Sequence, residues 1–461
     1  LSPNLEVISK MSGEVKENKM GVMPVNKLLL SMAVPMMISM LVQAMYNIVD
    51  SIFVAKLSEE ALTAVSLAFP LQSLMISVCT GLCVGMNALL SRYLGAKDSE
   101  GVNKSALNGL LLIFIGYLIF LFVGLFLIPT FMYAQTPIES IAEQGITYTK
   151  IVSICSIAFF SQMAFERLLQ ATGRTLYTMC TQTTGAVINI ILDPILIFGL
   201  FGMPKLGVAG AAIATVIGQT IAALMALTFN IKKNHDIHLH FKGFRPSSRT
   251  IGKILSVGIP SILMASMGSV MTFGMNKILM TFSATAIAVF GSYFKLQSFI
   301  FMPVFGLNNG MVPIIAFSYG ARKRDRMIKT IKLSIAYAVC IMIIGFAIMQ
   351  IFPDKLLLMF NASETMLSIG VPALRIISVS FLFAGISIVS LSVFQALGHG
   401  VLSMMVSFMR QLIFLLPSAY LLSLTGDINK VWFSFLIAEV ISVSLSLLSM
   451  RYLYKKVIKN L

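Results

Sequence analysis

The sequence carries little charge for its length. Only 11% of its 461 residues are Asp, Glu, Lys or Arg, whereas a soluble domain has roughly 25%. Hydrophobic residues make up 57% of the chain. This composition excludes an ordinary soluble domain and predicts an all-α polytopic membrane protein.

Acidic residues are scarcer than basic ones. The chain has 18 Asp and Glu against 34 Lys and Arg, a formal net charge of +16. The basic residues do not form a nucleic-acid-binding surface, because they lie in short polar connections between apolar runs. That distribution is the orientation signal of membrane proteins. We therefore expect a lipid bilayer, and no nucleic acid, as partner.

Catalytic and metal-binding motifs are missing. The chain has no GxxxxGK[ST] sequence, no HExxH sequence and nothing that resembles a hydrolytic triad, which argues against an internal ATPase or a hydrolase. The five cysteines lie in apolar runs, and no His stands beside Cys79 and Cys83 to complete a metal site. We expect free thiols, no cofactor and no enzymatic activity.

Residues 1–27 also lack the apolar core of a cleaved signal peptide. The first apolar run is therefore expected to target the chain to the membrane and to remain there.

Apolar runs long enough to cross the ~30 Å hydrocarbon core occur about twelve times. The predicted spans are 28–56, 61–91, 105–134, 144–171, 175–202, 207–231, 252–282, 286–318, 328–352, 366–397, 401–425 and 430–454. Most Lys and Arg residues fall at the two ends of the chain and in every second connection. By the positive-inside rule both termini are expected to be cytoplasmic.

The longest polar connection lies at the midpoint and separates two sets of six spans. The predicted organisation is a cytoplasmic N-terminal segment 1–27, an N-lobe 28–231, a cytoplasmic linker 232–253, a C-lobe 254–454 and a cytoplasmic tail 455–461. His235, His238 and His240 of the linker are either a weak metal site or, as we favour, part of a solvated loop.

The two sets of spans are an internal repeat. A shift of 225 residues, without a gap, carries Pro35 onto Pro260 and Gly85 onto Gly310. The same shift carries Gly81, Gly95 and Gly173 onto Gly306, Gly320 and Gly398. Since each half has an even number of spans, the halves should be related by a pseudo-two-fold axis along the membrane normal. This is a parallel-repeat transporter architecture.

The first span carries a polar stripe. Gln43, Tyr46, Asn47 and Asp50 fall on one helical face of a run that is otherwise apolar. An acid within a membrane span marks an ion or substrate path by default. The alternative is an Asp that is hydrogen-bonded between packed helices.

A second acid lies in the fifth span. Asn189 and Asp193 are four residues apart and face the same way, and Pro194 leaves the carbonyl of Ile190 without its helical donor. Amide, carboxylate and carbonyl oxygens suit a hard cation. The first and fifth spans run in the same direction, so Asp50 and Asp193 should meet in the outer half of the N-lobe. Two separate packing acids are the alternative.

The repeat duplicates the scaffold and not these acids. Asp50 maps onto Met275 and Asp193 onto Ser418, which assigns the ion chemistry to the N-lobe. Two carboxylates in a dry site cannot both stay ionised at low cost. Such a pair suits a proton carrier, and it equally suits Na⁺ in place of the proton.

Glu166 has no counterpart either, since it maps onto Leu391. It belongs to an interfacial salt bridge with a snorkelling Arg167, or it meets a cationic substrate. The sequence assigns no partner to the charged residues of the C-lobe spans: Lys277, Lys295, Arg375, Arg410 and Glu439.

At this point the chain resembles the MATE (multidrug and toxic compound extrusion) family. The resemblance covers about residues 24–455. The segments that carry it are LLLSMAVPMMISMLVQAMYNIVDSIFVAK, GLCVGMNALLSRYLGAKD, RLLQATGRTLY, NIILDPILIFG, GLNNGMVPIIAFSYGARK and FQALGHG. It implies the two-lobed MATE/MOP fold.

The resemblance also implies roles for single residues. It implies a cation site at Asp50, Asn189 and Asp193, a hinge at Pro35, and drug recognition by Glu166 as in the MepA-like branch. The acidic C-lobe cation site of the NorM-like branch is missing from this sequence.

We therefore expect a secondary active antiporter of the bacterial cytoplasmic membrane. It would export small organic cations in exchange for H⁺ or Na⁺ and function as a monomer. Its substrate-binding residues would be Gln43, Tyr46, Asn47 and Glu166, and any Na⁺ would bind at the Asp50 site. The alternatives are a flippase for a lipid-linked saccharide precursor, and a channel or sensor without coupled transport.

Overall fold

The computed structural model describes residues 17–239, 241 and 243–461. Residues 1–16 of the expected N-terminal segment lie outside this range, as do His240 and Lys242 of the expected linker. The possible linker histidine site includes His240 and so lies partly outside the described residues. Throughout the described residues, regular secondary structure is helical.

The structure has ten helices that are long and apolar enough to span a membrane, and twelve spans when two bent helix pairs are counted as one each. These counts refer to the described residues and agree with the predicted number. Nine spans are single helices: α3 (Val25–Leu57), α4 (Glu59–Gly95), α5 (Ser99–Phe126), α9 (Thr175–Phe198), α10 (Val208–Lys233), α11 (Ser248–Met280), α12 (Ala284–Gly320), α13 (Arg324–Ile351) and α19 (Ile428–Lys456). The tenth is made of α17 (Gly400–Phe408), the π-helical η2 (Met409–Leu415) and α18 (Leu416–Ser423). Short helices are α2 (Lys19–Val22), α6 (Ile128–Tyr133), η1 (Leu200–Gly202), α14 (Pro353–Leu358) and η3 (Ile458–Asn460).

The two bent spans occupy equivalent places in the two halves. Helix α7 (Glu139–Ile154) meets α8 (Ile157–Ala171) at 42°, and α15 (Glu364–Ser378) meets α16 (Phe381–Ala396) at 52°. Neither bend contains Pro or Gly. At each bend a serine hydroxyl, of Ser156 or Ser380, donates to the carbonyl three residues earlier at 2.7 Å. Such side-chain bonds compete with the helical ladder and bend it.

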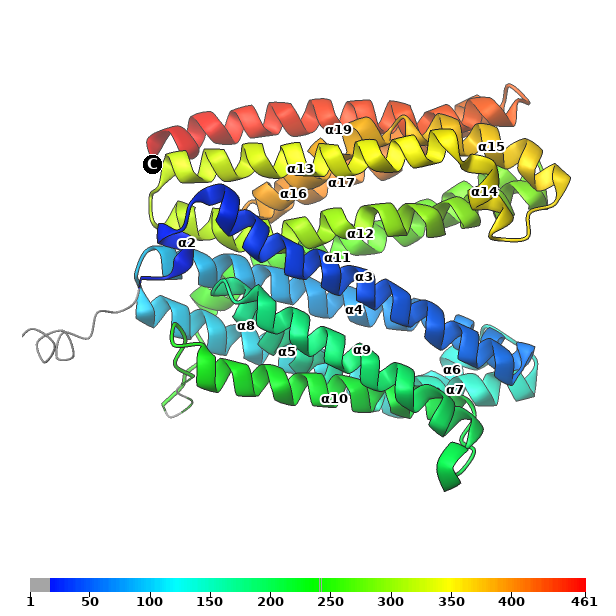
Figure 1. The fold of residues 1–461 in the computed structure, drawn as a ribbon, viewed down its shortest axis with the longest axis horizontal. Coiled ribbons are helices and arrows are strands. Elements are labelled where there is room, and N and C mark those ends of the chain that lie inside the picture. Colours follow the sequence, from blue (N-terminus) through cyan, green and yellow to red (C-terminus); the bar gives the residue numbers. More distant parts are fainter. Residues whose placement is uncertain (1–16, 240, 242) are drawn as a thin grey trace, which may run out of the picture.

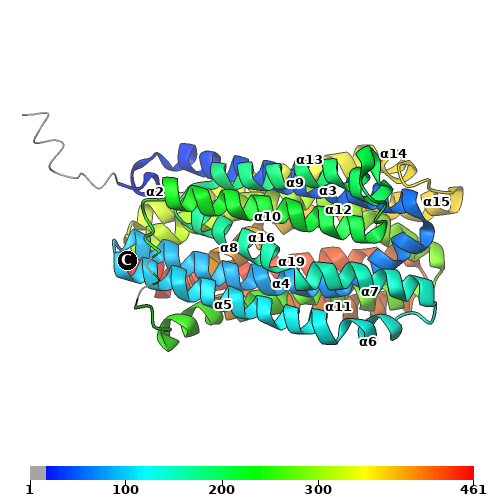
Figure 2. The same ribbon diagram turned by 90° about the horizontal axis from the view of Figure 1, so that it is seen from below.

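The two halves contact each other mainly through the first two spanning helices of each half. In Figures 1 and 2 the helices of both halves run along a common axis. Helix α3 packs against α9 of its own half and α12 of the other, and α11 packs against α17 and α4. The 225-residue shift converts the first set of contacts into the second, so the arrangement has the pseudo-two-fold relation that the repeat predicts.

One end of the bundle carries most of the basic loops. Helix α2, the connection from α10 to α11, and the C-terminus all lie at this end (Figure 1). We call it the basic end. Helices α3 and α11 start here, while α4 and α12 finish here at Gly95 and Gly320.

Glycines related by the repeat lie where the halves touch. A Cβ atom built on Gly306 would lie 2.5 Å from Cα of Met37, and one on Gly310 would lie 2.7 Å from Cα of Ala33. On the other side of the axis, Cβ atoms on Gly81 and Gly85 would collide with the backbone of α11. We call this contact the glycine seam, formed by Gly81, Gly85, Gly95, Gly306, Gly310 and Gly320.

The seam runs from the middle of the helices to the basic end. Its last pair, Gly95 and Gly320, places the final turns of α4 and α12 against each other's carbonyl groups. Small residues permit such close helix approach within membranes. In this structure the two halves are therefore closed against each other toward the basic end.

We expect Gly310→Ala to destabilise the protein. The added Cβ would press on backbone atoms of α3, and overpacking of this kind costs about 1–3 kcal/mol. The matched control is Gly291→Ala in the same helix, where the added Cβ meets nothing within 4 Å. Thermal unfolding in detergent measures both. Equal unfolding temperatures for the two variants would show that the seam is not close-packed.

Candidate functional site

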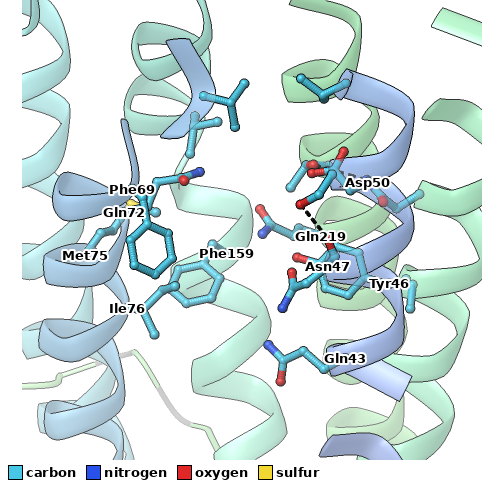
Figure 3. Close-up of a pocket in the computed structure, with 18 of the residues that line it drawn as sticks. Gln43, Tyr46, Asn47, Asp50, Phe69, Gln72, Met75, Ile76, Phe159 and Gln219 are labelled. Atoms are coloured by element: carbon cyan, nitrogen blue, oxygen red, sulfur yellow. Dashed lines mark hydrogen bonds between the residues drawn. The ribbon is translucent and has the colours of Figure 1, made fainter. Parts of the chain in front are cut away.

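A cavity of about 590 Å³ lies within the N-terminal half. Helices α3, α4, α7, α8, α9 and α10 supply its walls. The polar stripe of the first span lines it, as predicted from helical spacing: Gln43, Tyr46, Asn47 and Asp50. Figure 3 shows these side chains on α3, across the cavity from residues of α4.

The α4 wall was not predicted. Phe69, Gln72 and Ile76 lie opposite the α3 stripe (Figure 3), and Gln72 donates to the hydroxyl of Tyr148 at 3.1 Å. Spacings of three and four residues place them on one helical face. The spacing can be seen in the sequence, but one polar residue, Gln72, in an apolar run does not identify a polar helix face.

The structure brings the two N-lobe acids together. The carboxyl groups of Asp50 and Asp193 are close enough to interact with each other. Each carboxylate has one buried oxygen, Oδ1, without a hydrogen-bond partner in the described part of the chain. Asp50 lines the cavity, while Asp193 is fully buried behind it. The pair can take up one proton or one small cation between its oxygens.

Asn189 fixes one side of this pair. With its amide turned to suit both neighbours, its nitrogen donates to Oδ2 of Asp193 at 3.1 Å. Its oxygen then accepts from the backbone nitrogen of Thr215 at 3.0 Å. Thr215 on α10 therefore belongs to the site, although the sequence analysis did not single it out. These contacts orient Asp193 toward Asp50.

Glu166 lies one layer behind the cavity wall. It is 1% exposed and accepts from Gln162 at 3.0 Å, from Thr181 at 2.8 Å and from Gln182 at 2.7 Å. Gln162 and Gln182 also line the cavity. A substrate in the cavity thus meets Glu166 through these two amides, or directly if they turn aside.

Arg167 is buried within the helix bundle. It is 6% exposed and donates to the side-chain oxygens of Gln170 at 2.9 Å and Asn309 at 3.1 Å. Among the described residues it makes no ion pair within 4 Å. The salt bridge between Glu166 and Arg167, one of the two alternatives from the sequence, is therefore not formed within 4 Å in the described chain. The signal that was missing is the contact with Asn309, which lies 142 residues away in the chain.

Four of the five charged residues of the C-terminal spans have partners outside the cavity. Arg410, on the π-helical turn, lies 3.6 Å from Glu439 of α19. Lys277 lies over the ring of Phe273, and another lysine, Lys295, lies over the ring of Phe360. Arg375 is exposed. None of these charged groups lines the cavity.

Comparisons with known proteins agree with this architecture. A sequence model of the MatE family matches residues 35–195 and 260–421, and the two stretches begin at the prolines that the repeat relates. The multidrug export protein MepA of Staphylococcus haemolyticus is 28% identical over 429 residues, covering 91% of this chain and 92% of the relative. MepA of Staphylococcus aureus is 27% identical over 423 residues, covering 90% of this chain and 91% of the relative.

A solved structure has the same fold. It is an outward-facing conformation of a multidrug resistance MATE family transporter of the MOP superfamily. Its TM-score is 0.91 at 25% identity, with coverage of 97% of this chain and 99% of that chain. The family match covers both halves of the repeat, so the chain belongs to the MATE family of membrane transporters.

Proposed function

We propose that this protein is a secondary active multidrug efflux antiporter that exchanges organic cations for H⁺ or Na⁺. One observation carries the proposal. The cavity has Asp50 at its wall, with Asp193 buried behind it, and no Lys or Arg among its lining residues in the described chain. Such a site attracts cations. Its aromatic and methionine side chains, which include Phe69, Met75, Phe159 and Met163, suit flat apolar cations of varied shape.

The names of the relatives support this substrate class. Both MepA proteins are multidrug export proteins, and the similarity extends over nine tenths of this chain. On this proposal Gln43, Tyr46 and Asn47 contact the substrate directly, and Glu166 recognises its positive charge. The protein works as a transporter rather than an enzyme, and it needs no cofactor.

The carboxylate pair is the proposed coupling site. Two buried carboxylates side by side repel each other unless a proton or a cation lies between them. Asp50 and Asp193, with the amide of Asn189, offer the oxygen ligands that Na⁺ takes, and they equally hold a proton. Binding of the ion therefore competes with the positive charge of a substrate in the same cavity.

Helix α3 links the coupling site to the seam. Asp50 lies in its second half, while Ala33 and Met37 of its first half pack on the seam glycines of α12. Pro35 lies between Ala33 and Met37 in the sequence, and because it has no N–H it leaves the helix without one backbone hydrogen bond. We propose that it is the hinge at which ion binding repacks α3. The ion drives transport only through its different affinity for two states.

The basic end is the proposed cytoplasmic side. By the positive-inside rule both ends of the chain are then cytoplasmic in a bacterial inner membrane. The seam holds the two repeat halves together on the cytoplasmic side. The cavity lies farther along the helices, toward the opposite end of the bundle. The structure then corresponds to a state that releases substrate outward. One chain contains the whole site, so we propose a functional monomer.

The rival functions are less well supported. A flippase for a lipid-linked saccharide needs a cationic cavity for the pyrophosphate group, and the charged residue that lines this cavity in the described chain is the acid Asp50. A channel or sensor needs no close-packed, repeat-related seam between two halves. A lipid-flipping assay and single-channel recording would detect these activities directly.

We expect ethidium export to depend on an imposed ion gradient. The experiment uses purified protein in proteoliposomes, with a pH gradient alone or a Na⁺ gradient alone. Export with the pH gradient only makes the acid pair a proton carrier, and export with Na⁺ only makes it a metal site. Gradient-independent export, or none with either gradient, would contradict the proposed antiport.

We expect Asp50→Asn to abolish gradient-driven export while the protein still folds. The neutral amide can neither take up a proton nor form the anionic half of a cation site. The control is Asp427→Asn, because Asp427 only caps α19 through a 2.9 Å bond from the backbone of Asn429. Thermal unfolding confirms that both variants are intact. Normal export by Asp50→Asn would remove the acid pair from the mechanism.

A further inference from the structure

Arg167 bridges the two halves of the protein inside the seam. It belongs to α8 of the N-terminal half, and its partner Asn309 belongs to α12 of the other half. Asn309 lies between the seam glycines Gly306 and Gly310. The bond must therefore break whenever the halves part at the basic end.

This bridge is absent from the equivalent place in the repeat. The 225-residue shift carries Arg167 onto Ser392, and Asn309 corresponds to Val84. Ser392 donates only to the carbonyl of Ile388 in its own helix. If the bridge served packing alone, we would expect it in both halves, as the glycines around it are. This one occurs only in the half that contains the acids.

The backbone around Arg167 nevertheless follows the repeat. Thr178 donates to the carbonyl of Glu166 at 3.3 Å, and its counterpart Ser403 donates to the carbonyl of Leu391 at 3.1 Å. The two halves thus share the local frame and differ in the side chains on it. Glu166 and Arg167 are added together, as neighbours, to one half.

Among the residues that the structure describes, the two buried charges have only neutral hydrogen-bond partners. Glu166 accepts from two amides and one hydroxyl, while Arg167 donates to two amide oxygens and keeps its Nε without a partner. They make no ion pair within 4 Å in the described chain, but the charge of Arg167 acts on its neighbour Glu166 through space. A substrate cation that binds at Glu166 would leave the arginine uncompensated in a site of low dielectric, where like charges repel strongly.

We infer that Arg167 is a positioning residue that lowers the affinity of Glu166 for cationic substrates while the seam is closed. Asn309 and Gln170 hold its positive charge beside Glu166 in that state. When the halves part, Arg167 loses Asn309 and is free to turn toward water. The affinity of the Glu166 site for a cationic substrate is then higher when the seam is parted and the substrate is loaded. It is lower when the seam is closed and the substrate is released, as export requires.

This inference rests on the proposed role of Glu166 in recognising substrate charge. It also implies the reverse effect, because coupling between two events is reciprocal. A cation bound at Glu166 should weaken the Arg167–Asn309 bridge and favour parting of the halves.

The test is equilibrium binding of tetraphenylphosphonium to the purified full-length protein. We expect Arg167→Gln to tighten binding about tenfold, since a nearby buried charge changes affinity by at least that factor. Spin labels at Glu100→Cys and Asp325→Cys, two exposed positions at the basic end related by the repeat, report whether the seam stays closed. They require a background without the five native cysteines.

The matched control is Arg92→Gln. Arg92 also joins the halves, through a guanidinium 4.4 Å from the ring centre of Tyr319, but it is exposed and remote from the cavity lining. We expect this variant to loosen the seam without a comparable gain in affinity. Equal tightening by both variants would make Arg167 a simple seam contact and overturn the inference.

Two further variants separate the possible failures. Arg167→Lys keeps the charge and should bind the probe as weakly as the native protein, and tenfold tightening in this variant would contradict a charge effect. In a Glu166→Gln background, Arg167→Gln should give no gain. If Glu166→Gln alone leaves binding unchanged, the proposed role of Glu166 fails. If it weakens binding while Arg167→Gln changes nothing, only the present inference fails.

Discussion

The close approach of the two halves along α3–α12 and α4–α11 is the constraint on which the rest depends. Six glycines related by the repeat remove the side chains that would hold these helices apart. Dispersion contacts and close packing stabilise helix association in lipid, where burial of apolar surface contributes little. A seam of this kind is either packed or parted, because close-packed surfaces do not deform continuously. The seam thus allows two discrete arrangements, packed and parted. In the proposed antiport, ion binding shifts the equilibrium between them.

Against this symmetric scaffold the charges are asymmetric. The acids Asp50, Asp193 and Glu166 and the bridging Arg167 all belong to the N-terminal half, and none has a charged counterpart under the repeat. Packing explains the duplicated glycines, since the same backbone contact occurs twice. The acids do not follow the symmetry, so packing does not explain them. An unpaired carboxylate in a membrane span is costly and persists where function needs it.

The sequence was sufficient for the spans and for the acid pair. Long apolar runs identify spans regardless of tertiary contacts, and helical spacing placed Asp50 on the cavity face of α3. It was insufficient for the bends at Ser156 and Ser380, because neither has the Pro or Gly that marks a kink. Nor could it reveal the Arg167–Asn309 bond, which depends on how the two halves register across the seam. Local pattern carries no information on such distant pairs.

The buried acids of the two halves differ in the source of the positive charge that neutralises them. In the C-terminal half Glu439 has Arg410 at 3.6 Å. That cation is part of the chain, so the pair carries its own neutralising charge. In the described part of the chain Asp50 and Asp193 have no Lys or Arg within 4 Å, so in the proposed antiport their neutralising charge comes from solution. Only a charge that comes and goes can connect an ion gradient to a change of state. For this reason the proposed antiport assigns the coupling of transport to ions to the lobe whose acids have no Lys or Arg within 4 Å in the described chain.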